Sequence, residues 1–203
     1  MNRAALVLGA VTGAALAGAV WWRRHPSACP YGQRLWIEAP HPLITRERLR
    51  EALALQPGET VLEVGPGTGY YSLPVARWIA PGTLHVVDIQ QKMLDHTLRS
   101  ARAEGIANLE PRLGDARALP YGDATFDATY LVAVLGEVPD QEAALRELRR
   151  VLTPDGRVVV GELFGDPHMV GEATLRRRAA AARLRFDRRI GPRFGYFGVL
   201  RPE

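Results

Sequence analysis

Residues 60–70 read TVLEVGPGTGY, and this stretch decides the fold of the chain. It begins with a short apolar, β-branched run that is typical of a buried strand, and glycines follow directly at positions 65, 67 and 69. A glycine-rich turn between a strand and a helix lets the backbone approach a ligand closely. Because an amphipathic segment comes next, at residues 68–79, the stretch predicts a strand, a ligand-binding turn and a helix.

The same alternation of short apolar runs and amphipathic segments continues to the end of the chain. Strands are predicted at residues 60–64, 84–88, 109–113, 126–134 and 157–163, and helices at 45–55, 68–79, 90–103, 140–152 and 170–184. Two more strands are predicted around Gly191-Pro192. The predicted fold is therefore α/β: a doubly wound, mostly parallel seven-stranded sheet with helices on both faces and an antiparallel C-terminal strand pair.

The spacing of the glycines and the acid before them indicate which ligand the turn would hold. A dinucleotide-binding turn has the pattern G-x-G-x-x-G, but here Tyr70 stands at the third glycine position, and no phosphate-binding lysine follows. Glu63 lies two residues before Gly65, where it would repel a pyrophosphate and attract an ammonium or sulfonium cation. The sequence therefore favours a cationic ligand.

Four motifs in order resemble those of class I S-adenosylmethionine-dependent methyltransferases. The E-x-G-x-G-x-G of residues 63–69 is similar to motif I, and Asp88 ends the second predicted strand nineteen residues after Gly69. Residues 114–127 contain GDA, LPY and FD, and residues 152–157 read LTPDGR. The resemblance covers about residues 43–200. It is strongest to the type-11 group, which includes the ubiquinone/menaquinone C-methyltransferases.

The resemblance implies S-adenosylmethionine as the cofactor and assigns residues to each of its parts. It implies Asp88 on the ribose hydroxyls, Ile89 against the adenine face, and Asp115 with Ala116 at the adenine. The methionine part is expected against Glu63, Gly65, Pro66, Gly67 and Gly69.

The acceptor side of the site has weaker signals. Tyr31, His41 and Tyr70 are the candidates for the substrate. No catalytic residue is predicted, because the methyl group of a sulfonium is already activated and the protein mainly has to position the acceptor. No cluster of histidine, cysteine and carboxylate has the spacing of metal ligands, so no metal is expected. The type-11 group often has two histidines after the fourth strand, where this chain has Gly136-Glu137.

Several of these residues also have a purely structural interpretation. Glu63 could be a surface acid at a strand end, and Asp88 could be the N-cap of the next helix. Asp115 could be a turn residue. Glu137 is interpreted as a solvated loop acid rather than a substrate base, and Cys29 as an ordinary thiol rather than a lipid-attachment site.

Residues 4–22, AALVLGAVTGAALAGAVWW, contain no charge and are long enough to cross a bilayer as a helix. Three interpretations stay open: an N-terminal membrane anchor, a cleaved export signal ending at Ala17-Gly18-Ala19, or an apolar helix packed against protein. Arg23 and Arg24 follow directly and favour the anchor, with the rest of the chain facing the cytoplasm.

Composition limits the class of protein and its organisation. The chain has 203 residues, 47% apolar and 24% charged, which excludes collagen-like, low-complexity and disulfide-scaffold classes. Residues 171–203 contain nine arginines and three acids, a local net charge of +6, so the rest of the chain has a net charge of −2 within the total of +4. Cys29 is the single cysteine, which fits a reducing compartment. We expect an anchor candidate at residues 1–24, a proline-rich linker or arm at 25–42 and the methyltransferase-like domain at 43–203.

The function implied by the resemblance is transfer of a methyl group from S-adenosylmethionine. An anchor beside the domain would concentrate lipid-like molecules near it, so the expected acceptor is small and hydrophobic or lipid-like. A nucleic-acid partner is not expected, because the chain outside its basic tail is slightly acidic. Two alternatives are a cytoplasmic enzyme acting on a soluble molecule and a membrane-tethered binding protein without activity.

Overall fold

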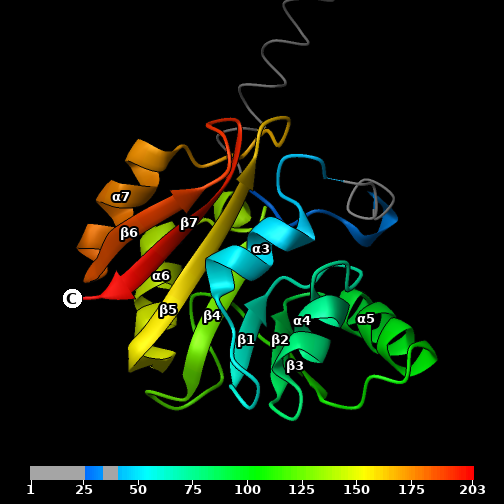
Figure 1. Cartoon of the computed structure of the whole chain (residues 1–203). Helices are drawn as coiled ribbons and strands as arrows, with labels where there is room; N and C mark the ends of the chain where they lie inside the picture. Colours follow the sequence, from blue (N-terminus) through cyan, green and yellow to red (C-terminus); the bar gives the residue numbers. More distant parts are fainter. Residues whose placement is uncertain (1–25, 34–40) are drawn as a thin grey trace, which may run out of the picture.

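A seven-stranded sheet in the order β3-β2-β1-β4-β5-β7-β6 runs through the molecule (Figure 1). The computed structural model describes residues 26–33 and 41–203. The first five strands are parallel to one another, and β7 runs antiparallel between β5 and β6. The strands are β1 (Val61–Val64), β2 (Leu84–Asp88), β3 (Leu109–Leu113), β4 (Phe126–Val132), β5 (Leu152–Leu163), β6 (Leu184–Ile190) and β7 (Gly195–Pro202). The predicted α/β sheet with its antiparallel C-terminal pair is confirmed.

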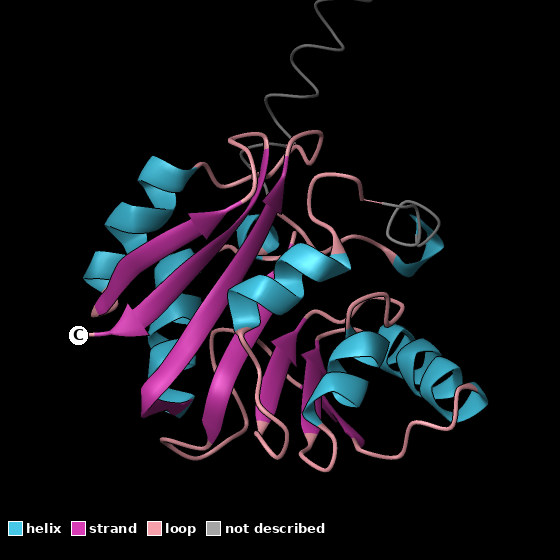
Figure 2. Ribbon diagram, in the orientation of Figure 1, coloured by secondary structure: helices cyan, strands magenta, loops and turns pink. Residues whose placement is uncertain are grey.

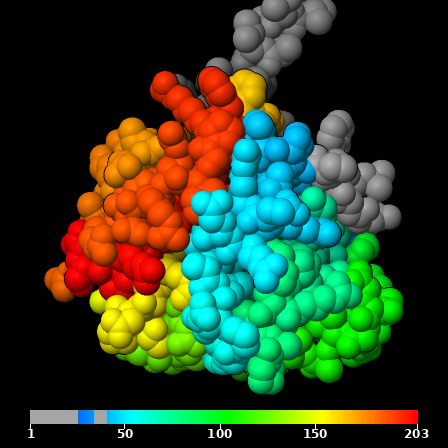
Figure 3. Space-filling model, in the orientation of Figure 1, coloured from blue at the N-terminus to red at the C-terminus, as the bar shows by residue number. Residues whose placement is uncertain are grey.

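Helices cover both faces of this sheet (Figure 2). One face carries α3 (Arg46–Leu53), α4 (Ser72–Ile79) and α5 (Gln91–Ala103), and the other carries α6 (Gln141–Val151) and α7 (Glu172–Ala181). Two short 3-10 turns complete the described elements: η1 (Tyr31–Gln33) precedes α3, and η2 (Leu135–Glu137) lies between β4 and α6. Each face of the sheet has its own apolar core. Figure 3 shows α3 in cyan between the C-terminal strands and the half of the molecule that contains α4 and α5.

Two helix starts follow from capping side chains that the sequence supplies. The Thr45 hydroxyl accepts a hydrogen bond from the Arg48 amide (3.3 Å) and begins α3. The Asp140 carboxylate accepts one from the Ala143 amide (2.9 Å) and begins α6. Both caps satisfy amides that have no partner within the helix.

Two predicted boundaries differ from the structure for identifiable reasons. The helix expected at residue 68 begins only at Ser72, because Gly67 and Gly69 have positive φ angles that a right-handed helix does not accept. The strand expected at residue 157 already begins at Leu152, which pairs with Phe126. The register then shifts, so that Ala128 pairs with Arg157 and the LTPDGR motif forms an irregular strand start.

The carboxyl ends of β1, β2 and β4 meet at one edge of the sheet, where the strand order reverses between β1 and β4. In open α/β sheets, ligands bind in the crevice outside such a reversal point. The predicted apolar helix at residues 4–22 lies outside the described residues. No helix within residues 26–33 and 41–203 is both long and apolar enough to cross a membrane.

Candidate functional site

The glycine-rich turn after β1 has the backbone that its sequence requires. Gly65, Gly67 and Gly69 have φ angles of +71°, +57° and +93°, which side-chain-bearing residues rarely adopt. A Cβ atom on Gly65 would lie only 2.5 Å from Cγ2 of Val134, beyond the end of β4. The turn therefore needs glycine for its conformation and for its close approach to the chain after β4.

Glu63 lies beneath this turn and is almost completely buried, with 2% of its surface exposed. Its carboxylate accepts a hydrogen bond from the Ser72 hydroxyl at the start of α4. Burial raises the pKa of Glu63 to about 7, and the hydrogen bond from Ser72 opposes this shift. The interpretation of Glu63 as a surface acid is wrong, because the carboxylate belongs to the interior just below the turn.

Asp88 ends β2 at the same edge of the sheet and is also buried. Its Oδ1 accepts a hydrogen bond from the Gln90 amide (2.8 Å). The N-cap of α5 is Gln90 itself, with no side-chain cap, so Asp88 is not the N-cap of that helix. Burial raises the pKa of Asp88 to about 6, and the hydrogen bonds from the Gln90 and Ile89 amides oppose this.

Two large apolar side chains beside Asp88 are open to solvent. Ile89 is 57% exposed, and Leu113, which pairs in register with Asp88 at the end of β3, is 55% exposed. Exposed branched apolar side chains next to a buried acid make a surface on which a flat aromatic group can rest. This arrangement fits the expectation that Ile89 contacts an adenine ring.

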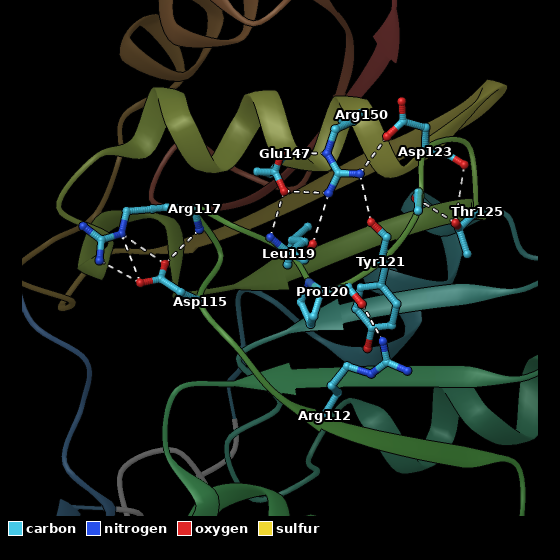
Figure 4. A network of polar contacts seen from close by, with 11 residues as sticks. Arg112, Asp115, Arg117, Leu119, Pro120, Tyr121, Asp123, Thr125, Glu147 and Arg150 are labelled. Carbon is cyan, nitrogen blue, oxygen red and sulfur yellow. Dashed lines mark hydrogen bonds and ion pairs between the residues drawn. The ribbon is translucent and has the colours of Figure 1, made fainter.

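Asp115 is held in a tight turn by Arg117 (Figure 4). It accepts a hydrogen bond from the Arg117 amide (2.8 Å) and forms an ion pair with its guanidinium (2.7 Å). The side-chain hydrogen bond from Arg117 lowers the pKa of Asp115. The turn-residue interpretation is therefore confirmed, and contact of Asp115 and the buried Ala116 with a ligand stays a prediction.

The loop that follows Asp115 is fixed to α6 by Arg150 and by Glu147, whose Oε2 accepts a hydrogen bond from the Leu119 amide (2.8 Å; Figure 4). Arg150 donates hydrogen bonds to the carbonyl oxygens of Leu119 (3.1 Å) and Tyr121 (2.9 Å). It also pairs with Asp123 and Glu147 (both 2.7 Å). These contacts give the GDA…LPY segment a defined position beside the site.

The described part of the proline-rich arm, residues 26–33, crosses this edge of the sheet. The Cys29 carbonyl oxygen accepts a hydrogen bond from Nε2 of Gln90 (3.0 Å), and the Cys29 amide donates one to Oε2 of Glu137 (3.1 Å). Further along, the Tyr31 hydroxyl contacts Nδ1 of His96 on α5 (3.1 Å). The arm thus bridges the loop after β2 and the turn after β4, over the region of Asp88.

Glu137 is correspondingly not a solvated loop acid, and that expectation is wrong. The residue is half-buried, and desolvation raises its pKa to about 7; the hydrogen bond from the Cys29 amide opposes this shift, and the charges of Asp166 and Asp88 add to it. Cys29 is bonded both to Glu137 and to Gln90, whose amide binds Asp88, so the two carboxyl groups lie around the same region. The sequence could not indicate this, because the residue that covers Glu137 is 108 positions away.

The three substrate candidates fall into two places. His41 and Tyr70 pack edge to face with ring centroids 5.5 Å apart, and the Arg46 guanidinium lies 4.2 Å above the Tyr70 ring. They line a cavity of about 310 Å³ together with Pro42, Thr45, Arg46 and Glu47. Burial lowers the pKa of His41, which favours the neutral ring. Tyr31 lies apart from them, in η1, where its hydroxyl contacts His96 of α5.

Several residues that support the site carry no sequence signal. Ser72 contacts Glu63, Val134 lies against Gly65, and the Thr97 hydroxyl donates to the Gly67 carbonyl oxygen (3.1 Å). The fourth such residue is Gln90, whose side chain donates a hydrogen bond to the Cys29 carbonyl oxygen. All four act through contacts between separate elements, which only the folded chain reveals.

The contact between Glu137 and the arm leads to a first prediction. Glu137→Ala removes the acceptor of the Cys29 amide, whereas Glu137→Gln retains a carbonyl oxygen. Because a hydrogen bond of this kind contributes roughly 1 kcal/mol, we expect exchange of the Cys29 amide hydrogen to speed up about fivefold in Glu137→Ala. Hydrogen exchange followed by mass spectrometry measures this. Glu137→Gln and the exposed-site control Glu142→Ala should retain protection, and equal protection in all three variants would contradict the bridge.

Comparison with known proteins agrees with this geometry. Residues 61–156 match the family described as a methyltransferase domain. The demethylmenaquinone methyltransferase of Lactobacillus johnsonii is 34% identical over 119 residues, 58% of this chain and 49% of that protein. The ubiquinone/menaquinone biosynthesis C-methyltransferase UbiE of a Ruegeria species is 36% identical over 126 residues, 62% of this chain and 50% of that protein. This chain thus spans about half the length of these curated relatives.

A solved structure extends the likeness to nearly the whole described fold. A SAM-dependent methyltransferase from Aquifex aeolicus superimposes with a TM-score of 0.77 at 21% sequence identity. The superposition covers 85% of this chain and 98% of that one. At this identity the likeness establishes the fold, and the chemistry rests on the site.

Proposed function

We infer that this chain, which resembles the class I S-adenosylmethionine-dependent methyltransferases in its motifs, its matched domain and its fold, transfers a methyl group to a small, hydrophobic or lipid-like acceptor. The observation that carries the proposal is the joint placement of two features at the reversal point of the sheet. One is the left-handed glycine turn, and the other is the buried carboxylate of Asp88.

The residues at this edge fit S-adenosylmethionine as the cofactor. Asp88 offers a second carboxylate oxygen to ribose hydroxyls, since one oxygen already binds the Gln90 amide. Ile89 provides an exposed apolar surface for the adenine. Glu63 and Asp88 together make the region beside the turn negative, which favours a ligand that carries sulfonium and ammonium charges. Bound there, the cofactor supplies a methyl group activated by the sulfonium.

The protein's own part is to position the acceptor and to exclude water. The arm at residues 26–33 covers the cofactor region through Cys29 and thereby limits access of solvent. Exclusion of water strengthens the electrostatic contacts inside such a site. No side chain is assigned as a general base, because an acidic or nucleophilic acceptor needs none.

The type of acceptor is proposed from the relatives and from the N-terminal sequence. The two curated relatives quoted above are named as methyltransferases of quinone biosynthesis. The apolar residues 4–22, followed by Arg23 and Arg24, would hold the domain at the cytoplasmic face of a membrane. A tether of this kind raises the local concentration of lipid-like acceptors.

The direct test is to incubate the full chain with S-adenosylmethionine carrying a labelled methyl group and to supply either a lipid extract or a cytosolic extract. We expect label in the chloroform-soluble product. Label only in water-soluble products would support the alternative, a methyltransferase for a soluble molecule. Cofactor binding without labelled product in either extract would support a binding protein without activity.

The raised pKa values of the two carboxyl groups predict how cofactor binding depends on pH. The cofactor is expected to bind the ionised forms, so affinity should fall as the pH drops through the pKa of about 7 for Glu63 and about 6 for Asp88. Each group contributes up to about a tenfold loss per pH unit below its pKa. Calorimetric titration between pH 5 and 7.5 measures this, and Asp88→Asn should flatten the lower part of the profile. A flat profile in the unaltered protein would argue against contact with the cofactor.

A further inference from the structure

Two phenylalanines stand exposed side by side at one tip of the molecule. Phe164 is 70% exposed and Phe194 is 59% exposed, and their rings meet edge to face with centroids 5.7 Å apart. The Phe164 amide donates a hydrogen bond to the Phe194 carbonyl oxygen (2.7 Å), which links the two turns that carry them. Among the described residues, the other exposed large apolar side chains are Ile89 and Leu113, which flank Asp88.

The tip lies at the same edge of the sheet as the proposed cofactor site. Phe164 directly follows the carboxyl end of β5, which is parallel to β1 and β4. Phe194 directly precedes β7, whose first residue, Gly195, pairs with Leu163 at the end of β5. In Figures 1 and 3 the loops after β5 and before β7 rise together at the top of the molecule.

The turns that carry the two rings are tight. Gly165 has a φ angle of +104° and Gly191 one of +95°, so both turns use conformations that favour glycine. A Cβ atom on Gly191 would lie 2.7 Å from the Gly195 carbonyl oxygen. The rings are therefore presented by defined backbone rather than by long loops, although isolated exposed apolar residues are common on soluble proteins.

The charge beside the rings and the course of the chain indicate what covers them. Arg193 precedes Phe194 and is exposed, and it forms no ion pair within the described part of the chain. The described arm begins at Pro26, three residues before Cys29, which is bonded at this same edge. The described chain that follows the apolar residues 4–22 in the sequence is therefore bonded at the edge that presents the rings.

We propose that the tip formed by Phe164, Arg193 and Phe194 contacts a lipid bilayer that carries anionic headgroups. The aromatic rings enter the interface, and Arg193 pairs with lipid phosphates, as aromatic and basic residues do at membrane surfaces. The edge with the cofactor site then faces the membrane, and a lipid-like acceptor reaches it without crossing water. This orientation extends the proposed function, but its test does not require activity.

A fluorophore whose emission depends on polarity, NBD, tests the contact at a single position. Cys29→Ser removes the only native thiol, and Phe194→Cys or Phe164→Cys then allows labelling at the tip. Asp155→Cys labels an exposed site at the opposite edge as the matched control. The full chain is mixed with vesicles of phosphatidylcholine, with or without phosphatidylglycerol. We expect a blue shift and brighter emission at positions 164 and 194, and no change at 155.

Four outcomes would overturn the proposal. They are unchanged emission at 164 and 194 on vesicle-bound protein, no binding to vesicles, equal shifts at all three positions, and a shift that rises with protein concentration without vesicles. The last outcome would indicate a contact between two copies of the chain. Arg193→Ala should weaken binding to anionic vesicles about fivefold and leave binding to neutral vesicles unchanged. If the fluorescence shifts at positions 164 and 194 are observed but no methyl transfer is detected, the proposed function is contradicted and the membrane contact is not.

Discussion

Asp88→Ala should weaken binding of S-adenosylmethionine about 100-fold. The carboxylate is buried at the end of β2, and the Gln90 amide occupies only one of its two oxygens. Hydrogen bonds to a charged group contribute about 1.5–3 kcal/mol each, and about 1.4 kcal/mol corresponds to a tenfold change in affinity. Calorimetry with the cofactor measures the dissociation constant directly. Asp88→Asn keeps the shape and one acceptor oxygen, so it should lose less than Asp88→Ala.

The fold itself should tolerate the loss of Asp88. Its raised pKa indicates that burial costs this carboxylate more than its hydrogen bonds return in the free protein. Asp155→Ala removes an exposed carboxylate at the opposite edge of the sheet and controls for the change in net charge. If Asp88→Ala is folded and binds the cofactor within twofold of the unaltered protein, Asp88 does not belong to the cofactor site.

The order and type of the strands and helices follow from local sequence patterns. The central parallel strands contain short runs of buried apolar residues, as in Val61–Val64, and each cap and glycine turn has its own chemical signature. These signals reach only a few residues along the chain. They therefore predict the fold and the glycine turn well, together with Asp88, whose position depends on the end of a strand.

The relations between distant segments could not be predicted in this way. Glu137 looks like a loop acid until the arm places Cys29 against it. Asp115 is by contrast a local case, because Arg117, only two residues further on, pairs with both of its oxygens in the turn that the sequence suggests. The start of α4 at Ser72 could have been predicted in part, because the positive φ angles of Gly67 and Gly69 belong to a glycine motif that the sequence shows. A contact over a long sequence distance thus decides the surroundings of Glu137, which is why the sequence alone does not predict them.

Gly65→Ala should weaken cofactor binding by about 10- to 100-fold. The position has a φ angle of +71°, which costs a residue with a side chain roughly 1–2 kcal/mol. The new methyl group would also lie 2.5 Å from Cγ2 of Val134, so the turn or the chain after β4 must move. Either movement displaces backbone groups that contact the ligand, and loss of such positioning is costly. Calorimetry of cofactor binding and thermal unfolding should be measured on the same samples.

Two further variants separate the clash from the backbone strain. Gly58 also has a positive φ angle, +92°, but a Cβ atom there meets nothing within 4 Å. Gly58→Ala should therefore lower the unfolding temperature and leave cofactor affinity unchanged. Val134→Ala removes the methyl groups that would clash. In the double variant with Gly65→Ala, part of the cofactor affinity should return, while the backbone strain at position 65 remains. No recovery in the double variant would mean that strain alone disables the turn, and full affinity in Gly65→Ala would contradict the role of the turn in binding.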